Sequence, residues 1–265
     1  MPKSEERMPD RFVKFLGTAG ARFVVARQLR SSAGIWIRMA GQTVIYDPGP
    51  GTIVRCWAAK PQCDATKVNA IVLSHHHLDH AGDATVMVEA MTDGGTKRVG
   101  LLLAPRAAYE DDSPLCHYVQ RFPARVERLR EGSAHELGDL RITCVAAMQH
   151  GVETCGTVYS DGEKRVGFAP DTYYIEGIGE RYVGCDILVV NCVLFSDHGP
   201  GVPHLHPASA GRIIAEARPK RAILTHFGMN MLRNEPWKIA EELTQEIGIE
   251  VKAAGDGMMV DLDEG

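Results

Sequence analysis

The sequence predicts an α/β fold in which two β-sheets pack against each other and helices cover them, in a single domain over residues 11–265. Strand-length apolar segments bounded by glycine, proline or polar residues occur in both halves of the chain, and helical segments lie between them. No long linker divides the halves. The chain has 265 residues, of which 45% are hydrophobic, so it can bury a sizeable core. Residues 1–10 are expected to form a disordered lead-in.

The predicted elements follow from local patterns along the chain. Strands are expected at Phe12–Leu16, Phe23–Val25, Ile35–Ile37, Thr43–Tyr46, Ala70–Leu73, Gly100–Ala104, Arg141–Ala147, Gly156–Ser160, Arg165–Ala169, Ile187–Val190 and Ala222–Thr225. Ala70–Leu73 and Gly100–Ala104 are apolar throughout, which indicates buried strands. Helices are expected at Asp83–Met91, Pro207–Ala217 and Pro236–Ile247, and apolar residues recur at helical spacing in the last two.

Composition excludes several classes of protein. The formal net charge of −5 argues against a broad basic surface for long nucleic acids, because such binding depends on neutralising phosphates. The seven cysteines are scattered and contain no Cys-x-x-Cys pair, so a disulfide framework is not expected and a reducing compartment fits best. The polar N-terminus has no signal-peptide core, and no apolar run approaches the roughly 20 residues that span a bilayer. We therefore expect a cytoplasmic protein with no membrane association.

The run Ser74-His75-His76-His77-Leu78-Asp79-His80 directly follows the predicted strand Ala70–Leu73. It places four imidazoles and one carboxylate within seven residues at a strand end. Imidazole nitrogen and carboxylate oxygen are ligands for zinc and other first-row metals. The run therefore predicts a metal site at the edge of a sheet. The alternative is a solvent-exposed polar loop.

Further metal-capable residues stand just after other predicted strands. They are Asp47, His150, Asp171 and His226. Any one of them alone could be an ordinary turn residue, since aspartate is common in turns. Together with the histidine run they favour one convergent site. His117, His135 and His198 lack this context and are expected on the surface or in loops.

These residues carry a resemblance to a known family. His75-x-His77-x-Asp79-His80 matches the HxHxDH signature of the metallo-β-lactamase superfamily. The segment around Asp171 (Phe-Ala-Pro-Asp-Thr) resembles that of its bridging aspartate, and Leu-Thr-His226-Phe that of its terminal histidine. The resemblance covers about residues 13–260. It implies the αββα sandwich of that superfamily, with two mixed sheets face to face and helices outside.

The resemblance also implies a centre with two divalent ions. One ion would be held by His75, His77 and His150, and the other by Asp79, His80 and His226. Asp171 would bridge the ions together with a hydroxide that attacks the substrate. Asp47 would accept a hydrogen bond from a ligand histidine and fix its tautomer. Zn²⁺ is the expected metal, although the mixed ligand set also admits Mn²⁺ or Fe²⁺. The motif leaves His76 without a role.

His204 indicates a branch of the superfamily. It stands 22 residues before His226, where ribonuclease Z-like and phosphoribosyl cyclic phosphodiesterase-like members have a histidine that stabilises the transition state or protonates the leaving group. The alternative is a residue that caps or packs at a helix start. His204 and Asp79 are therefore the candidate catalytic residues. His206 stands where relatives often have a small polar residue, which leaves open which of the two histidines acts.

The expected substrate is a small or cyclic phosphodiester, which makes the chain a phosphodiesterase. The sequence has no Gly- and Lys-rich arm of the kind that clamps transfer RNA in ribonuclease Z, so a large RNA substrate is not expected. Arg30, Ser32 and His206 are possible contacts for a small anionic substrate. The stretch from Arg22 to Ser32 could instead be the solvated basic face of a strand.

Other functions remain open. The same metal pair could activate water toward a lactone, thioester or other carboxylic ester. A diiron oxidoreductase is disfavoured because that branch replaces a ligand histidine with a carboxylate and partners a flavin domain. A binding protein without catalysis is disfavoured because every expected ligand position is filled. A homodimer is possible, since dimers are common in this superfamily.

Overall fold

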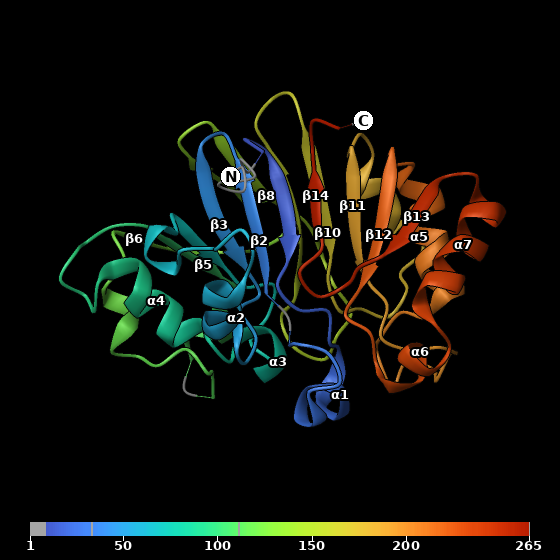
Figure 1. Cartoon of the computed structure of the whole chain (residues 1–265), viewed down its shortest axis with the longest axis horizontal. Helices are drawn as coiled ribbons and strands as arrows, with labels where there is room; N and C mark the ends of the chain where they lie inside the picture. Colours follow the sequence, from blue (N-terminus) through green and yellow to red (C-terminus); the bar gives the residue numbers. More distant parts are fainter. Residues whose placement is uncertain (1–8, 33, 111, 265) are drawn as a thin grey trace, which may run out of the picture.

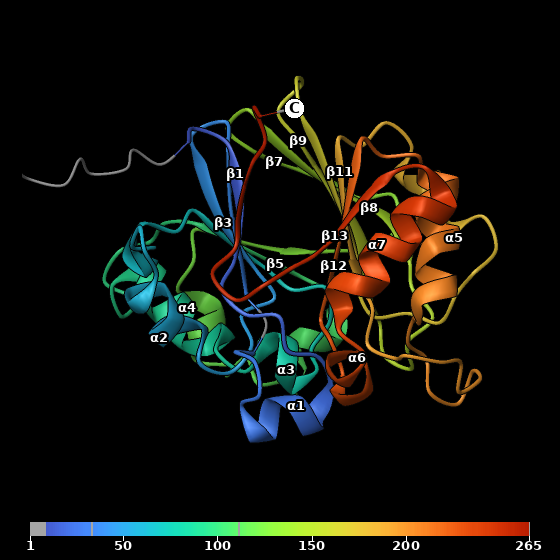
Figure 2. The same ribbon diagram turned by 45° about the vertical axis from the view of Figure 1, so that its right-hand side comes forward.

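A computed structural model describes residues 9–32, 34–110 and 112–264. The predicted lead-in over residues 1–10 lies outside this part except for its last two residues. Two mixed sheets of seven strands each face one another, and helices lie on their outer sides (Figures 1 and 2). The predicted architecture of two packed sheets covered by helices is thus confirmed.

The first sheet combines an antiparallel half with a parallel half. Its strands, in spatial order, are β14 (Met259–Asp261), β1 (Phe12–Phe15), β2 (Ile35–Met39), β3 (Gln42–Tyr46), β4 (Ala70–Val72), β5 (Leu101–Ala104) and β6 (Arg125–Arg128). Pairing is antiparallel from β14 to β3 and parallel from β3 to β6. The parallel strands β3 and β4 therefore end at the same edge.

The second sheet has the same number of strands. In spatial order they are β13 (Glu250–Ala253), β12 (Arg221–Thr225), β11 (Ile187–Asn191), β10 (Arg165–Ala169), β9 (Cys155–Ser160), β8 (Leu140–Ala147) and β7 (Ala134–Leu137). Strands β10 to β13 are parallel, and β9 is antiparallel to both β8 and β10. Hence β8, β10, β11 and β12 all run in one direction and end at one edge.

Apolar side chains on the facing sides of the two sheets form the central core. Val13, Val44 and Val72 from the first sheet join Phe168 and Ile223 from the second, and all five are buried. Alternation along the strands sends the other side chains outward, where helices cover them. Two outer clusters result, one on each side of the sandwich.

The helices divide between the two outer faces and one end of the sandwich. α2 (Thr52–Ala58) and α4 (Ala84–Thr92) cover the first sheet, and α5 (Pro207–Ala217) and α7 (Pro236–Ile247) cover the second (Figure 2). α1 (Ala21–Arg27), α3 (Leu78–Ala81) and α6 (Met229–Arg233) lie beyond one end of the sheets (Figures 1 and 2). Single 3-10 turns occur at Ala65–Lys67, Arg106–Tyr109, Val119–Arg121 and Ile178–Tyr182. No helix in the part of the chain that the structure describes could cross a membrane.

Two local predictions were wrong. The predicted strand Phe23–Val25 belongs to helix α1, so the basic stretch around it is not a strand face. Within that apolar run only Val24 is buried, whereas Phe23 is 64% exposed. His135 was expected on the surface or in a loop, but it is a buried residue of β7 whose Nδ1 lies 2.5 Å from Glu127 Oε2. His117 and His198 are exposed, as expected.

Candidate metal centre

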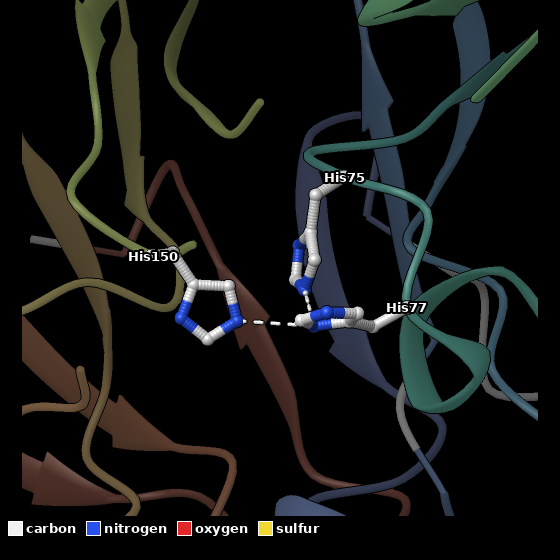
Figure 3. Close-up of side chains that lie close together, drawn as sticks. All are labelled: His75, His77 and His150. Carbon is white, nitrogen blue, oxygen red and sulfur yellow. Dashed lines mark hydrogen bonds between the residues drawn. The ribbon is translucent and has the colours of Figure 1, made fainter. Parts of the chain in front are cut away.

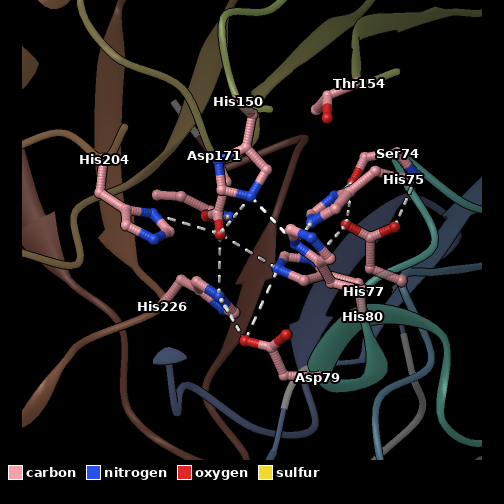
Figure 4. A network of polar contacts seen from close by, with 12 residues as sticks. Ser74, His75, His77, Asp79, His80, His150, Thr154, Asp171, His204 and His226 are labelled. Carbon is pink, nitrogen blue, oxygen red and sulfur yellow. Dashed lines mark hydrogen bonds and ion pairs between the residues drawn. The ribbon is translucent and has the colours of Figure 1, made fainter. Parts of the chain in front are cut away.

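The predicted ligands converge where the parallel strands of both sheets end. Figure 4 shows the histidines and aspartates from the two sheets pointing toward one another. The loop after β4 and the short helix α3 supply the residues from His75 to His80, and the loop after β8 supplies His150. Asp171 follows the end of β10 after one intervening residue, and His226 follows β12 directly. The shared strand direction brings residues that are far apart in sequence to one point.

Three histidines form the first group of donors. His77 Nδ1 lies 3.1 Å from His75 Nε2 and 3.1 Å from His150 Nε2 (Figure 3). The candidate ligand atoms of all three lie within 4.8 Å of one another. Because His150 belongs to the second sheet, this group joins the two sheets.

The second group consists of Asp79, His80 and His226. Asp79 Oδ2 lies 3.3 Å from His226 Nε2 and 3.9 Å from His80 Nε2. His80 and His226 are buried, and each Nε2 atom lacks a hydrogen-bond partner among the described residues. A buried nitrogen without a hydrogen-bond partner is costly, so the two Nε2 atoms fit the role of ligands to a cation.

Asp171 lies between the two groups. Its Oδ2 atom is 3.4 Å from His80 Nε2, 3.6 Å from His226 Nε2 and 3.7 Å from His150 Nε2. Its Oδ1 atom accepts a hydrogen bond of 2.8 Å from the side-chain amide of Asn191 at the end of β11. One carboxylate oxygen is therefore fixed, and the other faces both groups.

Asp47 supports the loop that carries the histidine run. Its carboxylate accepts 2.6 Å hydrogen bonds from the backbone N–H and the hydroxyl of Ser74, and it lies 2.9 Å from His80 Nδ1. A carboxylate at that distance accepts a hydrogen bond from the Nδ1–H of His80, which directs the lone pair of the neutral ring to Nε2. The predicted supporting contact of Asp47 is present.

Outer contacts set the tautomers of two more histidines. The Ser74 hydroxyl, which donates to Asp47, lies 2.9 Å from His75 Nδ1, and the Pro203 carbonyl accepts from His150 Nδ1 at 3.0 Å. The Nε2 atoms of His75 and His150 are therefore lone-pair donors that face the cluster. No role at the site was predicted for Ser74, although it begins the histidine run, and none was predicted for Asn191. Their positions at the ends of β4 and β11 were the available signal of such a role.

The electrostatics favour neutral histidines in the first group and an ionised carboxylate in the second. His80 differs, because Asp79, Asp171 and Asp47 outweigh its burial and raise its pKa well above the usual value, so a cation bound there would displace its proton. Burial lowers the pKa of His75 well below its usual value and that of His77 to about 4. Burial alone would raise the pKa of Asp79, but His80 and His226 together lower it. Neutral imidazoles and ionised carboxylates are the forms that bind divalent cations, so the residues present fit a metal site.

The structure separates the two candidate catalytic histidines. His204 Nδ1 lies 3.4 Å from Asp171 Oδ2, is buried without a hydrogen-bond partner among the described residues, and belongs to a side chain that is 18% exposed. His206 instead begins helix α5, where its backbone N–H donates to Ser209 Oγ at 2.9 Å, and its side chain lines a neighbouring cavity. Only His204 reaches the cluster.

The other predicted contacts lie near the cluster but do not join it. Ser32 is buried, and its hydroxyl accepts a 3.2 Å hydrogen bond from the Gln28 side chain. Its backbone pairs with Ala19, which pairs in turn with Phe227, the residue after His226. Within the described part of the chain, no hydrogen bond or ion pair connects Arg30 or Ser32 to the donor groups. His76 is also outside them, with its ring 5.9 Å from that of His77.

Comparison with known proteins identifies the family. Residues 42–227 match the family described as the β-lactamase superfamily domain. The chain belongs to the metallo-β-lactamase superfamily. A relative from Methanocaldococcus jannaschii, itself uncharacterised, is 30% identical, with 95% of each chain covered. A ribonuclease Z from Methanopyrus kandleri is 26% identical, with 94% of this chain and 96% of the relative covered.

Solved structures of this superfamily share the fold. The metallo-β-lactamase fold protein YhfI from Bacillus subtilis superposes with a TM-score of 0.75 and 19% identity, covering 96% of this chain and 99% of that one. A diphosphatase of the PhnP family gives a TM-score of 0.68 and 18% identity, with coverages of 96% and 98%. The family match and the ribonuclease Z relative identify this chain as a hydrolase of the metallo-β-lactamase superfamily, and the predicted resemblance to its ribonuclease Z-like members is confirmed.

Proposed function

We propose that this hydrolase is a metal-dependent phosphodiesterase that acts on a small or cyclic phosphodiester. The observation that carries the proposal is His204, a buried imidazole whose Nδ1 has no hydrogen-bond partner among the described residues and lies 3.4 Å from Asp171 Oδ2. A hydrogen-bond donor placed beside the candidate metal ligands can contact a non-bridging or leaving oxygen on phosphorus. A carboxylic ester offers one carbonyl oxygen and one leaving oxygen, whereas a phosphodiester offers two non-bridging oxygens and a leaving oxygen, so a phosphodiester gives His204 more acceptors.

Two divalent ions would occupy the donor groups. His75, His77 and His150 would hold one ion and Asp79, His80 and His226 the other, with Asp171 Oδ2 shared between them. When bound, the ions supply Lewis acidity and an activated water. Zn²⁺ fits three imidazoles best, and Mn²⁺ or Fe²⁺ also fit the mixed nitrogen and oxygen donors.

The side chains of the chain itself orient the reaction. His204 donates a hydrogen bond to a phosphate oxygen or to the leaving oxygen, which stabilises charge that builds up in the transition state. Asp79 and Asp171 add negative charge that holds the cations in place. Asn191 fixes one oxygen of Asp171, so that the other is held in a single orientation. Five of the candidate ligands are buried, which limits the access of bulk water to the site: His75, His80, His150, Asp171 and His226.

The proposed substrate is small rather than a folded RNA. The formal net charge of −5 provides little of the phosphate neutralisation on which affinity for long nucleic acids depends. We also propose a cytoplasmic location, because the seven cysteines are all free and six of them are buried.

A metal-reconstituted activity screen tests the proposal. Bis(4-nitrophenyl) phosphate, cyclic nucleotides, a precursor transfer RNA, lactones and thioesters are each offered to the wild type and to His204→Ala. We expect turnover of the small phosphodiesters, reduced about 100-fold or more in kcat by the substitution. Metal affinity measured by calorimetry should change little if His204 acts on the substrate. The ligand atoms of His150, Asp171 and His204 lie within 4.8 Å of one another, so a loss of metal affinity would make His204 a ligand instead.

Three results would contradict parts of the proposal. Turnover of lactones or thioesters without turnover of any phosphodiester would assign the chain to the carboxylic ester hydrolases. Processing of precursor transfer RNA at a kcat/KM above that of every small phosphodiester would replace the small substrate with RNA. Unchanged phosphodiester turnover in His204→Ala would remove the role given to that residue.

A further inference from the structure

A cavity of about 260 Å³ lies beside the metal centre. Its principal lining residues are Tyr173, Tyr174, Asp197, His206, Ser209 and Arg212. Tyr173 follows Asp171 by two residues, and His206 follows His204 by two residues. Because two residues span at most about 7 Å, the Cα atoms of these two lining residues lie within that distance of the Cα atoms of Asp171 and His204. A substrate bound at the centre could therefore extend into this cavity.

Arg212 is held in a fixed orientation in the cavity wall. The Cζ atom of its guanidinium lies 4.0 Å above the centre of the Tyr174 ring. The Tyr174 hydroxyl donates to Glu216, whose second carboxylate oxygen accepts a 2.9 Å hydrogen bond from the Gly179 N–H. Stacking on an anchored ring reduces the freedom that a long side chain would lose on binding.

The guanidinium of Arg212 is not paired with an acid in the part of the chain that the structure describes. Both oxygens of the nearest acid along the helix, Glu216, are already engaged by Tyr174 and Gly179. Among the described residues no ion pair or hydrogen bond involves the guanidinium of Arg212. An oriented guanidinium with free N–H groups is a receptor for carboxylate or phosphate.

The negative charge of Asp197, which lines the same cavity, would repel a bound anion. Its carboxylate accepts a 2.7 Å hydrogen bond from the Gly199 N–H and lies 3.5 Å from the Tyr173 hydroxyl. Asp197 and Arg212 are both exposed to solvent, which weakens the repulsion and the attraction of an anion alike, so the fixed orientation of Arg212 rather than its charge alone favours binding. The balance between Asp197 and Arg212 can be tested, because removing the charge of either residue shifts anion affinity in opposite directions.

We propose that this cavity is a subsite for a second anionic group of the substrate, a carboxylate or a phosphate, with Arg212 as its receptor. The proposal rests on the proposed function, since it places one end of the substrate at the metal centre. The substrate class is thereby narrowed to phosphodiesters that carry a further anionic group. His206, which the sequence suggested as a substrate contact, belongs to this subsite rather than to the reaction centre.

Affinity measurements on zinc-loaded protein test the subsite without requiring turnover. Calorimetry compares alkylphosphonates with ω-carboxyalkylphosphonates and with alkane bisphosphonates of increasing chain length. In the wild type, at least one chain length should bind about tenfold more tightly with the second anion than without it. The carboxylate and phosphonate series distinguish the two kinds of anion. The best chain length measures the span between the centre and Arg212.

Three variants make the assignment specific. In Arg212→Gln the singly and doubly anionic ligands should bind equally, and in Asp197→Asn the preference for the second anion should grow severalfold. Arg218→Gln is the matched control, an exposed arginine at the end of the same helix and outside the cavity, and it should retain the wild-type preference. A wild type without any preference, including one that binds neither kind of ligand, overturns the subsite. So does a preference that survives in Arg212→Gln. The proposed function is judged separately by hydrolysis of bis(4-nitrophenyl) phosphate.

Discussion

Single carboxylates hold the site together at the residue scale. Asp47 accepts hydrogen bonds from the Ser74 backbone, the Ser74 hydroxyl and His80, and it is itself buried. It has a positive φ of 47°, a conformation that aspartate and asparagine tolerate better than most residues. The carboxylate therefore fixes two neighbouring ligand segments from one position, because its two oxygens accept the hydrogen bonds of all three donors.

Asp47→Asn should weaken metal binding while keeping the fold. An amide offers one acceptor oxygen in place of two, so at least one donor of Ser74 or His80 loses its partner. We expect metal affinity to fall about 10–100-fold and stability to fall by about 1–3 kcal/mol. Calorimetric metal titration and urea unfolding measure the two effects. Asp93→Asn is the matched control, because Asp93 has a similar φ of 53° but is exposed. Equal metal affinity in the two variants would contradict the supporting role of Asp47.

Asn191→Ala should loosen the shared carboxylate. The substitution removes the 2.8 Å hydrogen bond to Asp171 Oδ1, after which the carboxylate can rotate away from the histidines. We expect metal affinity to fall about tenfold or more, the effect typical of lost outer contacts to a ligand. The visible spectrum of the cobalt-substituted protein should change as well, which a simple loss of stability would not cause. Asn230→Ala, an exposed asparagine on α6, serves as control. An unchanged cobalt spectrum would show that Asn191 does not orient Asp171.

At the scale of elements, strand ends were predictable and polar edge strands were not. Asp47, His150, Asp171 and His226 each follow an apolar strand, so their convergence could be read from the sequence. Strands β6, β7, β13 and β14 were missed. In β6 (Arg-Val-Glu-Arg) most residues are exposed, and so no apolar alternation marks the strand. These strands form because an existing sheet edge offers backbone hydrogen bonds, which is a tertiary effect.

Helix α1 shows the opposite error. Its apolar run Phe23–Val25 has strand composition, yet only Val24 packs inward, and an apolar triplet cannot reveal its period. The same limit hid α2, α3 and α6, which are at most two turns long. Ser74 and Asn191 were missed for a related reason: their roles depend on which side chains other strands place beside them. The ligand set was predicted because a dense motif marks it.

Gly20, which precedes α1, connects this helix to the site. A Cβ atom there would lie 2.1 Å from the backbone oxygen of His226 and 2.9 Å from the His226 ring. Gly20→Ala should therefore displace His226, lower metal affinity, and cost about 1–3 kcal/mol of stability through overpacking. Gly201→Ala is the control, because a Cβ atom at Gly201 meets no atom within 4 Å. Wild-type metal affinity in Gly20→Ala would show that the end of β12 can shift without moving the ligand.

At the scale of the whole molecule, the candidate ligands come from both sheets. His75, His77, Asp79 and His80 follow β4 of the first sheet, whereas His150, Asp171 and His226 follow strands of the second. Each proposed ion would thus have ligands from both sheets. The ions should act as cross-links between the two halves of the sandwich, in addition to the apolar core that lies between the sheets.

Removing the metal should therefore destabilise the whole chain rather than one loop. An ion that binds only the folded state stabilises it by about 4 kcal/mol when its free concentration is 1,000 times its dissociation constant. For a chain of this size each kcal/mol corresponds to about 2–4 °C in Tm, so chelation should lower Tm by roughly 10 °C, and added Zn²⁺ should restore it. Scanning calorimetry measures the shift. His150→Ala should shrink it, because the first group loses its histidine from the second sheet, whereas the exposed His198→Ala should not. Identical Tm values with and without chelator would mean that the ions do not link the sheets.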